Sequence, residues 1–249
     1  TPCPEGVAMT HRDILEVTPR DACGIREMVS CGQLQDEVAA GKQAAGTQSE
    51  YQKAVDQLTW KELIDRGVAH MNAEQYQDGL NAFMKAIDIN PGYSWAYIDA
   101  GWALNSLGDY QQALKVLNKA EALDPRNPWT YVNRAGTYNF LGNFSQALSD
   151  AEKALGIDAN IFWAYFERGW AQIGLGNFDR ALQDLNRCGQ MEPNNGAVYR
   201  MRAWAYSGRG DKRLALADLD RSVELEPKSQ WTYWNRAAFF SPIAPSTMP

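Results

Sequence analysis

The sequence has few of the residues that metal binding, catalysis and nucleic-acid binding depend on. Its 249 residues include two histidines, His11 and His70, and four cysteines. Acidic residues outnumber basic ones by 30 to 24, which gives a net charge of −6, whereas nucleic-acid binding requires a basic surface. No apolar run reaches the roughly 18–20 residues that a membrane-spanning helix needs. We therefore expect neither nucleic-acid binding nor a membrane span.

The motifs of common enzymes are missing as well. The chain has no G-x-S-x-G elbow, no H-E-x-x-H zinc motif, no phosphate-binding loop and no C-x-x-C pair. Each of these patterns supplies a nucleophile, a metal ligand or a phosphate cradle at a fixed spacing. The expected protein is therefore not an enzyme, needs no cofactor and binds no metal.

A sequence period of 34 residues is what the chain does contain. An acidic or amide residue followed by proline recurs at Asn90-Pro91, Asp124-Pro125, Glu192-Pro193 and Glu226-Pro227. The remaining place in the series holds Asp158-Ala159, without the proline. With each proline as position 32, five repeats span 60–93, 94–127, 128–161, 162–195 and 196–229. A fixed period of this length indicates a repeat solenoid.

Each repeat divides into two predicted helices. Small residues recur at positions 8, 20 and 27, where two antiparallel helices can approach closely, and glycine recurs near position 15, where the chain must turn. This pattern resembles the tetratricopeptide-repeat (TPR) family over residues 60–240. The resemblance implies an all-α, right-handed superhelical solenoid of helix-turn-helix pairs, with the first helices lining a concave face.

The two ends of the chain fall outside the five repeats. Residues 1–59 predict an extension that begins extended and continues with about two helices, near 25–38 and 48–58. Residues 230–240 predict a single capping helix, as solenoids commonly have. Residues 241–249 contain three prolines and predict an extended tail.

Three of the four cysteines lie in the N-terminal extension, at Cys3, Cys23 and Cys31. Cysteines clustered in a segment with little core favour a disulfide, with the pairing left open. Cys188 fills a small-residue position and is expected to be a buried thiol. The chain does not begin with methionine, which fits either a removed signal peptide or a piece of a longer chain. Together these features favour an extracytoplasmic protein over a cytoplasmic one.

Arginine at position 7 and aspartate at position 23 occur together in repeats three to five. In repeat two both are replaced together, by Ala100 and Val116. The joint replacement indicates an ion pair between the two helices of one repeat and not a ligand-binding role. The predicted pairs are Arg134–Asp150, Arg168–Asp184 and Arg202–Asp218.

Eight of the nine tryptophans share one face of the predicted first helices. Positions 2, 5, 9 and 12 are three or four residues apart, so they lie on one side of a helix, and in the TPR family that side lines the groove. Aromatic stripes usually belong to the core. Here the core positions are already filled by tyrosine, leucine, glycine and alanine, so we interpret several of the tryptophan rings as ligand-binding. The predicted groove contains Trp95, Trp102, Trp129, Trp163, Trp170, Trp204, Trp231 and Trp234, with Asp99, Asn133, Glu167 and Arg200 as its polar residues.

An aromatic groove with acidic and amide groups suits ligands that stack on rings or carry positive charge. One subset of the family binds acidic peptide C-termini through basic and amide residues; the corresponding positions here include Ile64, Asp99 and Trp129, so we do not expect that ligand. We expect a non-catalytic scaffold that binds an extended partner segment. The segment belongs to another protein or to a second copy of this chain, in a head-to-tail oligomer or filament. A polysaccharide of a cell-envelope or export system is the alternative ligand.

Overall fold

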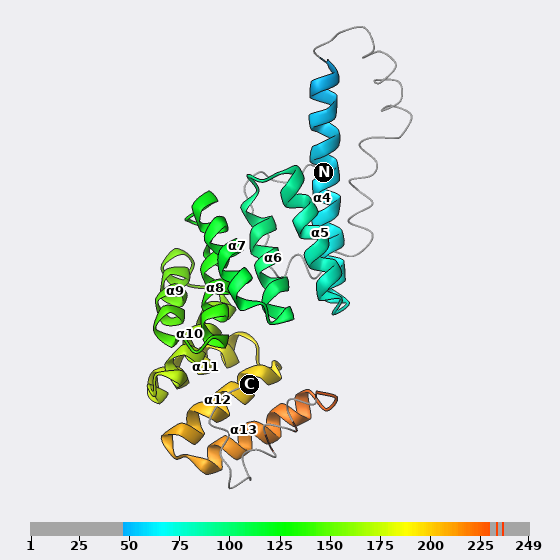
Figure 1. The fold of residues 1–249 in the computed structure, drawn as a ribbon. Coiled ribbons are helices and arrows are strands. Elements are labelled where there is room, and N and C mark those ends of the chain that lie inside the picture. Colours follow the sequence, from blue (N-terminus) through cyan, green and yellow to red (C-terminus); the bar gives the residue numbers. More distant parts are fainter. Residues whose placement is uncertain (1–46, 230–232, 234–235, 237–249) are drawn as a thin grey trace, which may run out of the picture. The chain divides into compact units, whose positions relative to one another are not determined.

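The computed structural model describes residues 47–229, Tyr233 and Arg236, with side chains from Thr59 onward. Within these residues the secondary structure is α-helical and strands are absent. The helices are α4 (Thr47–Asn72), α5 (Tyr76–Ile89), α6 (Ser94–Leu107), α7 (Tyr110–Leu123), α8 (Pro128–Phe140), α9 (Phe144–Ile157), α10 (Phe162–Gly174), α11 (Phe178–Met191), α12 (Gly196–Arg209) and α13 (Lys212–Leu225) (Figure 1).

The helices follow the 34-residue period. The first helices of repeats two to five, α6, α8, α10 and α12, begin at Ser94, Pro128, Phe162 and Gly196, which are position 1 of each repeat. The second helices α7, α9, α11 and α13 follow after a short turn. The predicted all-α solenoid of helix pairs is therefore confirmed.

The N-terminal side of repeat one differs from the sequence expectation. The sequence predicts a separate helix over 48–58 and a repeat that begins at 60, whereas the structure has one continuous helix, α4, from Thr47 to Asn72. No glycine or proline occurs between Thr47 and Arg66, so nothing in this stretch interrupts a helix. The predicted helix near 25–38 lies outside the described residues.

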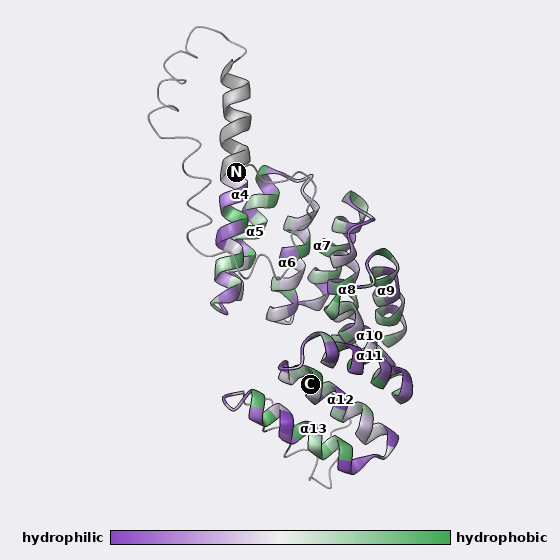
Figure 2. Ribbon diagram, turned by 180° about the vertical axis from the view of Figure 1, so that it is seen from behind, coloured by the Kyte–Doolittle hydropathy of each residue, from purple (hydrophilic) through white to green (hydrophobic). Residues whose placement is uncertain are grey.

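The chain divides into two compact units, residues 1–56 and 57–249, and the packing described here lies within the second. The second helices α7, α9 and α11 each pack against their own first helix and against the next one, as α7 does against α6 and α8. The first helices α6, α8, α10 and α12 also contact one another in order and form a first-helix layer. Figure 2 shows hydrophobic and hydrophilic segments alternating along the helices, as expected for helices that bury one side.

Close approach within a helix pair explains the small residues at position 8. A Cβ added to Gly101 would lie 2.7 Å from the side chain of Leu117, at position 24 of the same repeat. A Cβ on Gly169 would lie 3.0 Å from Leu185 in the same way. In repeat three, the corresponding residues are the fully buried Ala135 and Ala151. Repeats two and four therefore combine glycine on the first helix with leucine on the second, whereas repeat three has alanine on both helices.

Candidate interaction surface

Trp95, Asp99 and Trp102 share one face of α6, because residues three and four positions apart lie above one another on a helix. Both rings are half-buried and pack against the hydrophobic cluster that contains Phe83 and Ile98. Trp129, on α8, packs against the same cluster and is also half-buried. The predicted groove rings of repeats two and three therefore gather around one part of the core while keeping some surface open.

The same spacing recurs on α10 with Trp163, Glu167 and Trp170. The Trp163 ring is 37% exposed, with its centroid 5.1 Å from that of Phe162 and 5.5 Å from that of Phe166. Trp170 is only 8% exposed. Trp163 is thus held by two neighbouring rings with much of its surface open, whereas Trp170 lies in the interior.

Trp170 is buried because the last turn of α8 covers it. Its ring meets that of Phe140 edge to face, with 4.9 Å between the centroids. Phe140 in turn stacks on Tyr110, at 5.1 Å. Within the described residues, the indole Nε1 of Trp170 is buried without a hydrogen-bond partner. The structure therefore places Trp170 among the packing residues, away from the open ring of Trp163.

Glu167 explains why position 9 of repeat three is glycine where repeats two, four and five have tryptophan. A Cβ on Gly136 would lie 3.4 Å from Oε1 of Glu167, so the carboxylate of α10 occupies the space beside α8. Asn139 Nδ2, also on α8, donates to Glu167 Oε2 at 2.8 Å. A large ring at position 136 would compete with this carboxylate for the same volume.

Amide side chains join neighbouring first helices. At position 12 of repeats two and three, asparagine donates to the backbone carbonyl at position 6 of the next repeat: Asn105 to Asn133 O at 3.3 Å, and Asn139 to Glu167 O at 3.0 Å. Thr137 Oγ1 donates to Asn105 Oδ1 at 2.9 Å. Sequence reasoning missed these contacts, although the repetition of asparagine after 34 residues was a usable signal.

Two carboxyl groups of the first-helix layer are poorly solvated. Burial raises the pKa of Asp99 to about 7. Burial also raises the pKa of Glu167 to about 7, against a smaller lowering by the hydrogen bond from Asn139. In repeat one, desolvation and then the charge of Glu62 raise the pKa of Asp65. Position 6 thus holds carboxyl groups that are easier to protonate than ordinary ones.

The remaining predicted groove residues lie in repeats three and five and in residues 230–240. Arg200 forms an ion pair with Glu226, so its charge is already balanced. Trp204 is half-buried and packs against the hydrophobic cluster containing Leu185 and Val198. Asn133 donates through Nδ2 to the carbonyl of Trp129, one turn earlier, at 3.0 Å. Trp231 and Trp234 lie outside the described residues.

The three position-7 arginines contact the aspartates that the sequence assigns to them, each through two hydrogen bonds. Arg134 Nε lies 2.6 Å from Asp150, while Nη2 of Arg168 and Nε of Arg202 lie 2.7 Å from Asp184 and Asp218. The guanidinium carbons lie 5.1–5.5 Å from the ring centroids of Tyr131, Tyr165 and Tyr199.

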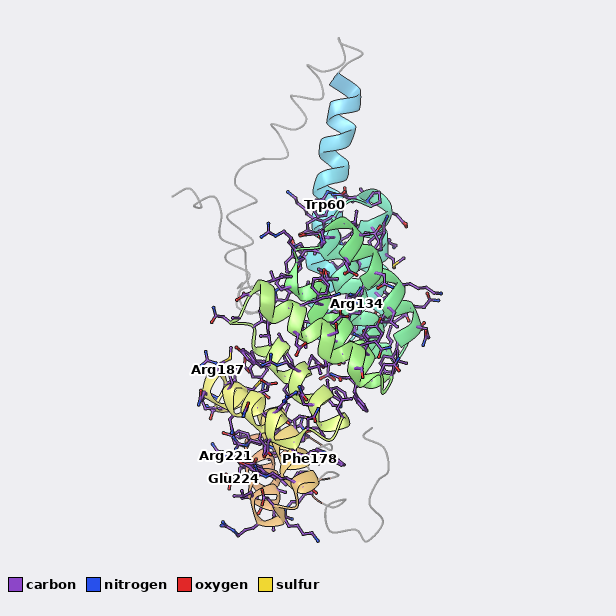
Figure 3. The ribbon with its side chains drawn as sticks, turned by 90° about the vertical axis from the view of Figure 1, so that its left-hand side faces the viewer. Trp60, Arg134, Phe178, Arg187, Arg221 and Glu224 are labelled. Carbon is purple, nitrogen blue, oxygen red and sulfur yellow. The ribbon has the colours of Figure 1, made fainter. Side chains whose placement is uncertain are left out.

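Two of these arginines, Arg134 and Arg202, also reach the preceding repeat, which the sequence did not indicate. Arg134 Nη1 donates to Asn118 at 2.8 Å and contacts Glu121, and Arg202 Nη1 donates to Asn186 at 3.0 Å. Figure 3 shows Arg134 among the side chains of neighbouring helices. Arg134 and Arg202 thus connect consecutive repeats, and each guanidinium is also paired with an aspartate of its own repeat.

Cysteine and metal chemistry are sparse in the described part of the chain. Cys188 is a free, fully buried thiol, and burial raises its pKa to about 12. Residues 59–229 contain no group of three or more His, Cys, Asp or Glu side chains placed to hold a metal ion. No helix among the described residues is long and apolar enough to cross a membrane. Cys3, Cys23 and Cys31, with their predicted disulfide, lie outside these residues.

Comparison with family models agrees with the helix pairs. Models described as TPR repeat or tetratricopeptide repeat match residues 82–115, 101–139, 130–161 and 164–195. The chain is a tetratricopeptide-repeat protein. No curated protein sequence matches it.

Solved structures share the fold at low sequence identity. A thermophilic TPR protein of Thermus thermophilus is 22% identical, with a TM-score of 0.65 over 72% of this chain and 98% of that one. MamA (41-end) from Desulfovibrio magneticus RS-1 is 17% identical, with a TM-score of 0.55 over 69% and 97%. YrrB, described as a TPR protein with an unusual peptide-binding site, is 18% identical, with a TM-score of 0.51 over 70% and 90%. These likenesses concern the fold.

Proposed function

We propose that this TPR protein is a non-catalytic scaffold that binds an extended partner segment along its first-helix layer, at the rings of Trp95, Trp102, Trp129 and Trp163. Stacked helix pairs create an extended surface suited to such a segment, and the TPR fold itself points to protein or peptide partners. The observation that carries the proposal is Trp163, a large ring left 37% exposed. Exposed rings beside other apolar groups commonly mark interaction sites.

Most charged side chains of the first-helix layer already have charged partners. Its arginines at position 7 are engaged by aspartates, and Arg200 is engaged by Glu226. The groups left to recognise a ligand are half-buried rings, amides and two carboxyl groups. Such a set can bind by stacking, hydrogen bonding and charge, and it lacks the paired nucleophile and base that covalent catalysis uses.

Selection from a displayed peptide library tests the proposal. Peptides selected by the wild-type protein should bind Trp163→Ala at least about tenfold more weakly, because removal of a hot-spot ring costs about 2 kcal/mol or more and about 1.4 kcal/mol is tenfold. The control is Ile157→Ala, which removes a similarly exposed apolar side chain (43%) from the second helix α9. Selected peptides that bind Trp163→Ala as well as the wild type would show that the segment binds elsewhere.

One version of the proposal makes the partner another copy of the chain. Residues 1–6 and 240–249 are proline-containing segments that a neighbouring molecule could offer to the rings, and a head-to-tail contact of this kind is able to propagate. Light scattering of the full chain, and of chains lacking residues 1–10 or 241–249, decides this version. An unchanged mass after both deletions, or a monomeric full chain, eliminates it.

A polysaccharide is the second candidate ligand, and the open ring of Trp163 is what favours it. Sugar rings stack on exposed tryptophan faces while amides and carboxylates bind their hydroxyl groups. Titration of soluble oligosaccharides, followed by tryptophan fluorescence, should then give saturable quenching that Trp163→Ala abolishes. No quenching at millimolar sugar would leave the peptide as the ligand to pursue.

A further inference from the structure

Asp99 is a carboxyl group without a partner beside aromatic rings. It lies on α6, four residues after Trp95 and three before Trp102, on the same face of the helix. Within the described residues it has no side-chain hydrogen bond or ion pair, and burial is the one cause that raises its pKa. The Asp99 side chain is half-buried, and charged groups withdrawn from water are normally paired, so the lack of a described partner distinguishes this carboxyl group from Glu167.

Glu167 occupies the same position two repeats later, and its carboxyl group does have a hydrogen-bond partner. Its Oε2 accepts from Asn139 at 2.8 Å, and its Oε1 faces the space left by Gly136. The residue that corresponds to Gly136 beside Asp99 is Val68 of α4, which packs on the same hydrophobic cluster as Trp102. Structural needs thus explain Glu167, whereas Asp99 serves no described contact.

The surroundings of Asp99 are aromatic and negatively charged. The pKa of Tyr93 is raised by burial and then by the charges of Asp99 and Asp65, so both carboxyl groups lie within electrostatic reach of this phenol. On α4, Glu62 adds to the negative charge around Asp65. Lys61, on the same helix, lies over the ring of Trp60, 5.6 Å from its centroid.

On the other side of α6, the first helix α8 contributes neutral groups. Its position-6 residue is Asn133, whose amide donates to a backbone carbonyl of its own helix. Its ring, Trp129, packs against the same cluster as Trp95 and Trp102. The described neighbours therefore supply rings and negative charge around Asp99, and the matching occupant is positive and flat or slender.

We infer that Asp99, with Trp95, Trp102 and Trp129, receives a lysine or arginine side chain of the bound partner segment. The inference rests on the proposed function and names the chemistry of its ligand. The carboxylate pairs with the cation, and the tryptophan faces attract it through their negative π-surface. Attraction between the two opposite charges offsets part of the desolvation cost that Asp99 carries alone.

Cation binding at this place has a thermodynamic consequence. The cation pairs with the ionised carboxylate, so binding drives a proton off Asp99. With the pKa of free Asp99 at about 7, the ionised fraction rises about tenfold between about pH 6 and about pH 8, and the apparent affinity rises with the competent fraction. An ordinary exposed carboxylate, fully ionised throughout this range, gives no such dependence.

A pair of matched peptides tests the inference. The first alternates proline and arginine, and the second replaces arginine with citrulline, which keeps the shape and loses the charge. Binding to the full chain is followed by fluorescence polarisation at constant salt, at about pH 6 and about pH 8. The variants are Asp99→Asn and the charge-matched control Asp88→Asn, an exposed residue of the second helix α5.

The expected result has three parts. The arginine peptide binds wild type and Asp88→Asn about tenfold more tightly at the higher pH, following the ionised fraction. Asp99→Asn binds it weakly at both pH values, and the citrulline peptide binds weakly to all three proteins. Circular dichroism and thermal unfolding establish that Asp99→Asn is folded, and the wild-type pH profile is informative without any variant.

Three results would overturn the inference. Equal binding of both peptides shows that the site reads shape or rings and not charge, and it leaves the proposed function standing. Equal weakening by Asp88→Asn shows attraction by the overall negative charge. Failure of both peptides to bind removes the cation site, while the library selection with Trp163→Ala decides separately whether a segment binds at all.

Discussion

Asn139 Nδ2 donates a hydrogen bond of 2.8 Å to Glu167 Oε2 across two neighbouring first helices. That bond favours the ionised carboxylate, yet burial outweighs it and raises the pKa of Glu167 to about 7. Asp99, with no such bond, has its pKa raised to about 7 as well. The first-helix layer therefore contains two carboxyl groups that bind a proton more tightly in the folded protein than in the unfolded chain.

The stability of the protein should accordingly fall as the pH rises through these groups. Unfolded carboxyl groups titrate near about pH 4, so the folded state holds extra protons between about pH 4 and about pH 7, and stability is lost across this window. We expect Asp99→Asn to remove up to about 4 kcal/mol of that loss, because the pKa difference is about three units and each unit corresponds to about 1.4 kcal/mol. Urea unfolding at a series of pH values measures it. Carboxylates paired with arginine change the stability in the opposite direction, so the test is the difference in unfolding free energy between Asp99→Asn and wild type at each pH. A difference that does not vary with pH would contradict the prediction.

Two glycine substitutions should have opposite effects. In Gly101→Ala the new Cβ meets Leu117 at 2.7 Å, and overpacking of this kind costs about 1–3 kcal/mol. In Gly136→Ala the nearest atom is Glu167 Oε1 at 3.4 Å, so the gain in helix propensity of up to about 1 kcal/mol should prevail. Chemical denaturation of both variants provides the comparison. Equal destabilisation would mean that helix packing around positions 8 and 9 is less specific than these distances imply.

Repeat two supplies a natural replacement for the Arg–Asp pair. Asp184→Ala leaves Arg168 without its partner and should cost about 2–3 kcal/mol, because an unpaired, partly buried charge is unfavourable. The double variant Arg168→Ala/Asp184→Val copies Ala100 and Val116 and should recover at least half of that cost. A double-mutant cycle isolates the coupling. Additive losses would show that the pair contributes nothing beyond its separate contacts.

The sequence predicted the helix pairs well because its signals are local. Glycine near position 15 and the turn at position 32 act on the residues around them, and they recur at the same spacing. The pairing of Arg134 with Asp150 was also readable, since both residues change together in repeat two. Asn105 and Asn139, by contrast, show the same 34-residue recurrence and went unused.

Exposure of individual rings could not be read from the sequence. Trp163 and Trp170 lie on the same helix face, yet one is 37% exposed and the other 8%. The difference comes from Phe140, which lies 30 residues earlier and covers Trp170 at 4.9 Å. The sequence predicts Arg200 as a groove residue for a similar reason: its ion-pair partner Glu226 lies 26 positions away, and the repeat pattern does not reveal that contact. Such contacts depend on how helices cross, which the period does not specify.

Position 15 offers the simplest stabilising change. Gly108 and its counterparts in later repeats adopt positive φ there, at 72° to 94°, whereas repeat one has Glu74 with φ 58°. Left-handed backbone costs a residue with a Cβ about 1–2 kcal/mol, which glycine avoids at some entropic expense in the unfolded chain. Glu74→Gly should therefore stabilise the protein by roughly 0.5–1 kcal/mol, seen as a higher urea midpoint. Glu74→Ala is the control, since it removes the same charge and keeps the Cβ. If Glu74→Ala raises the midpoint as much as Glu74→Gly, the gain comes from the lost carboxylate and not from the turn.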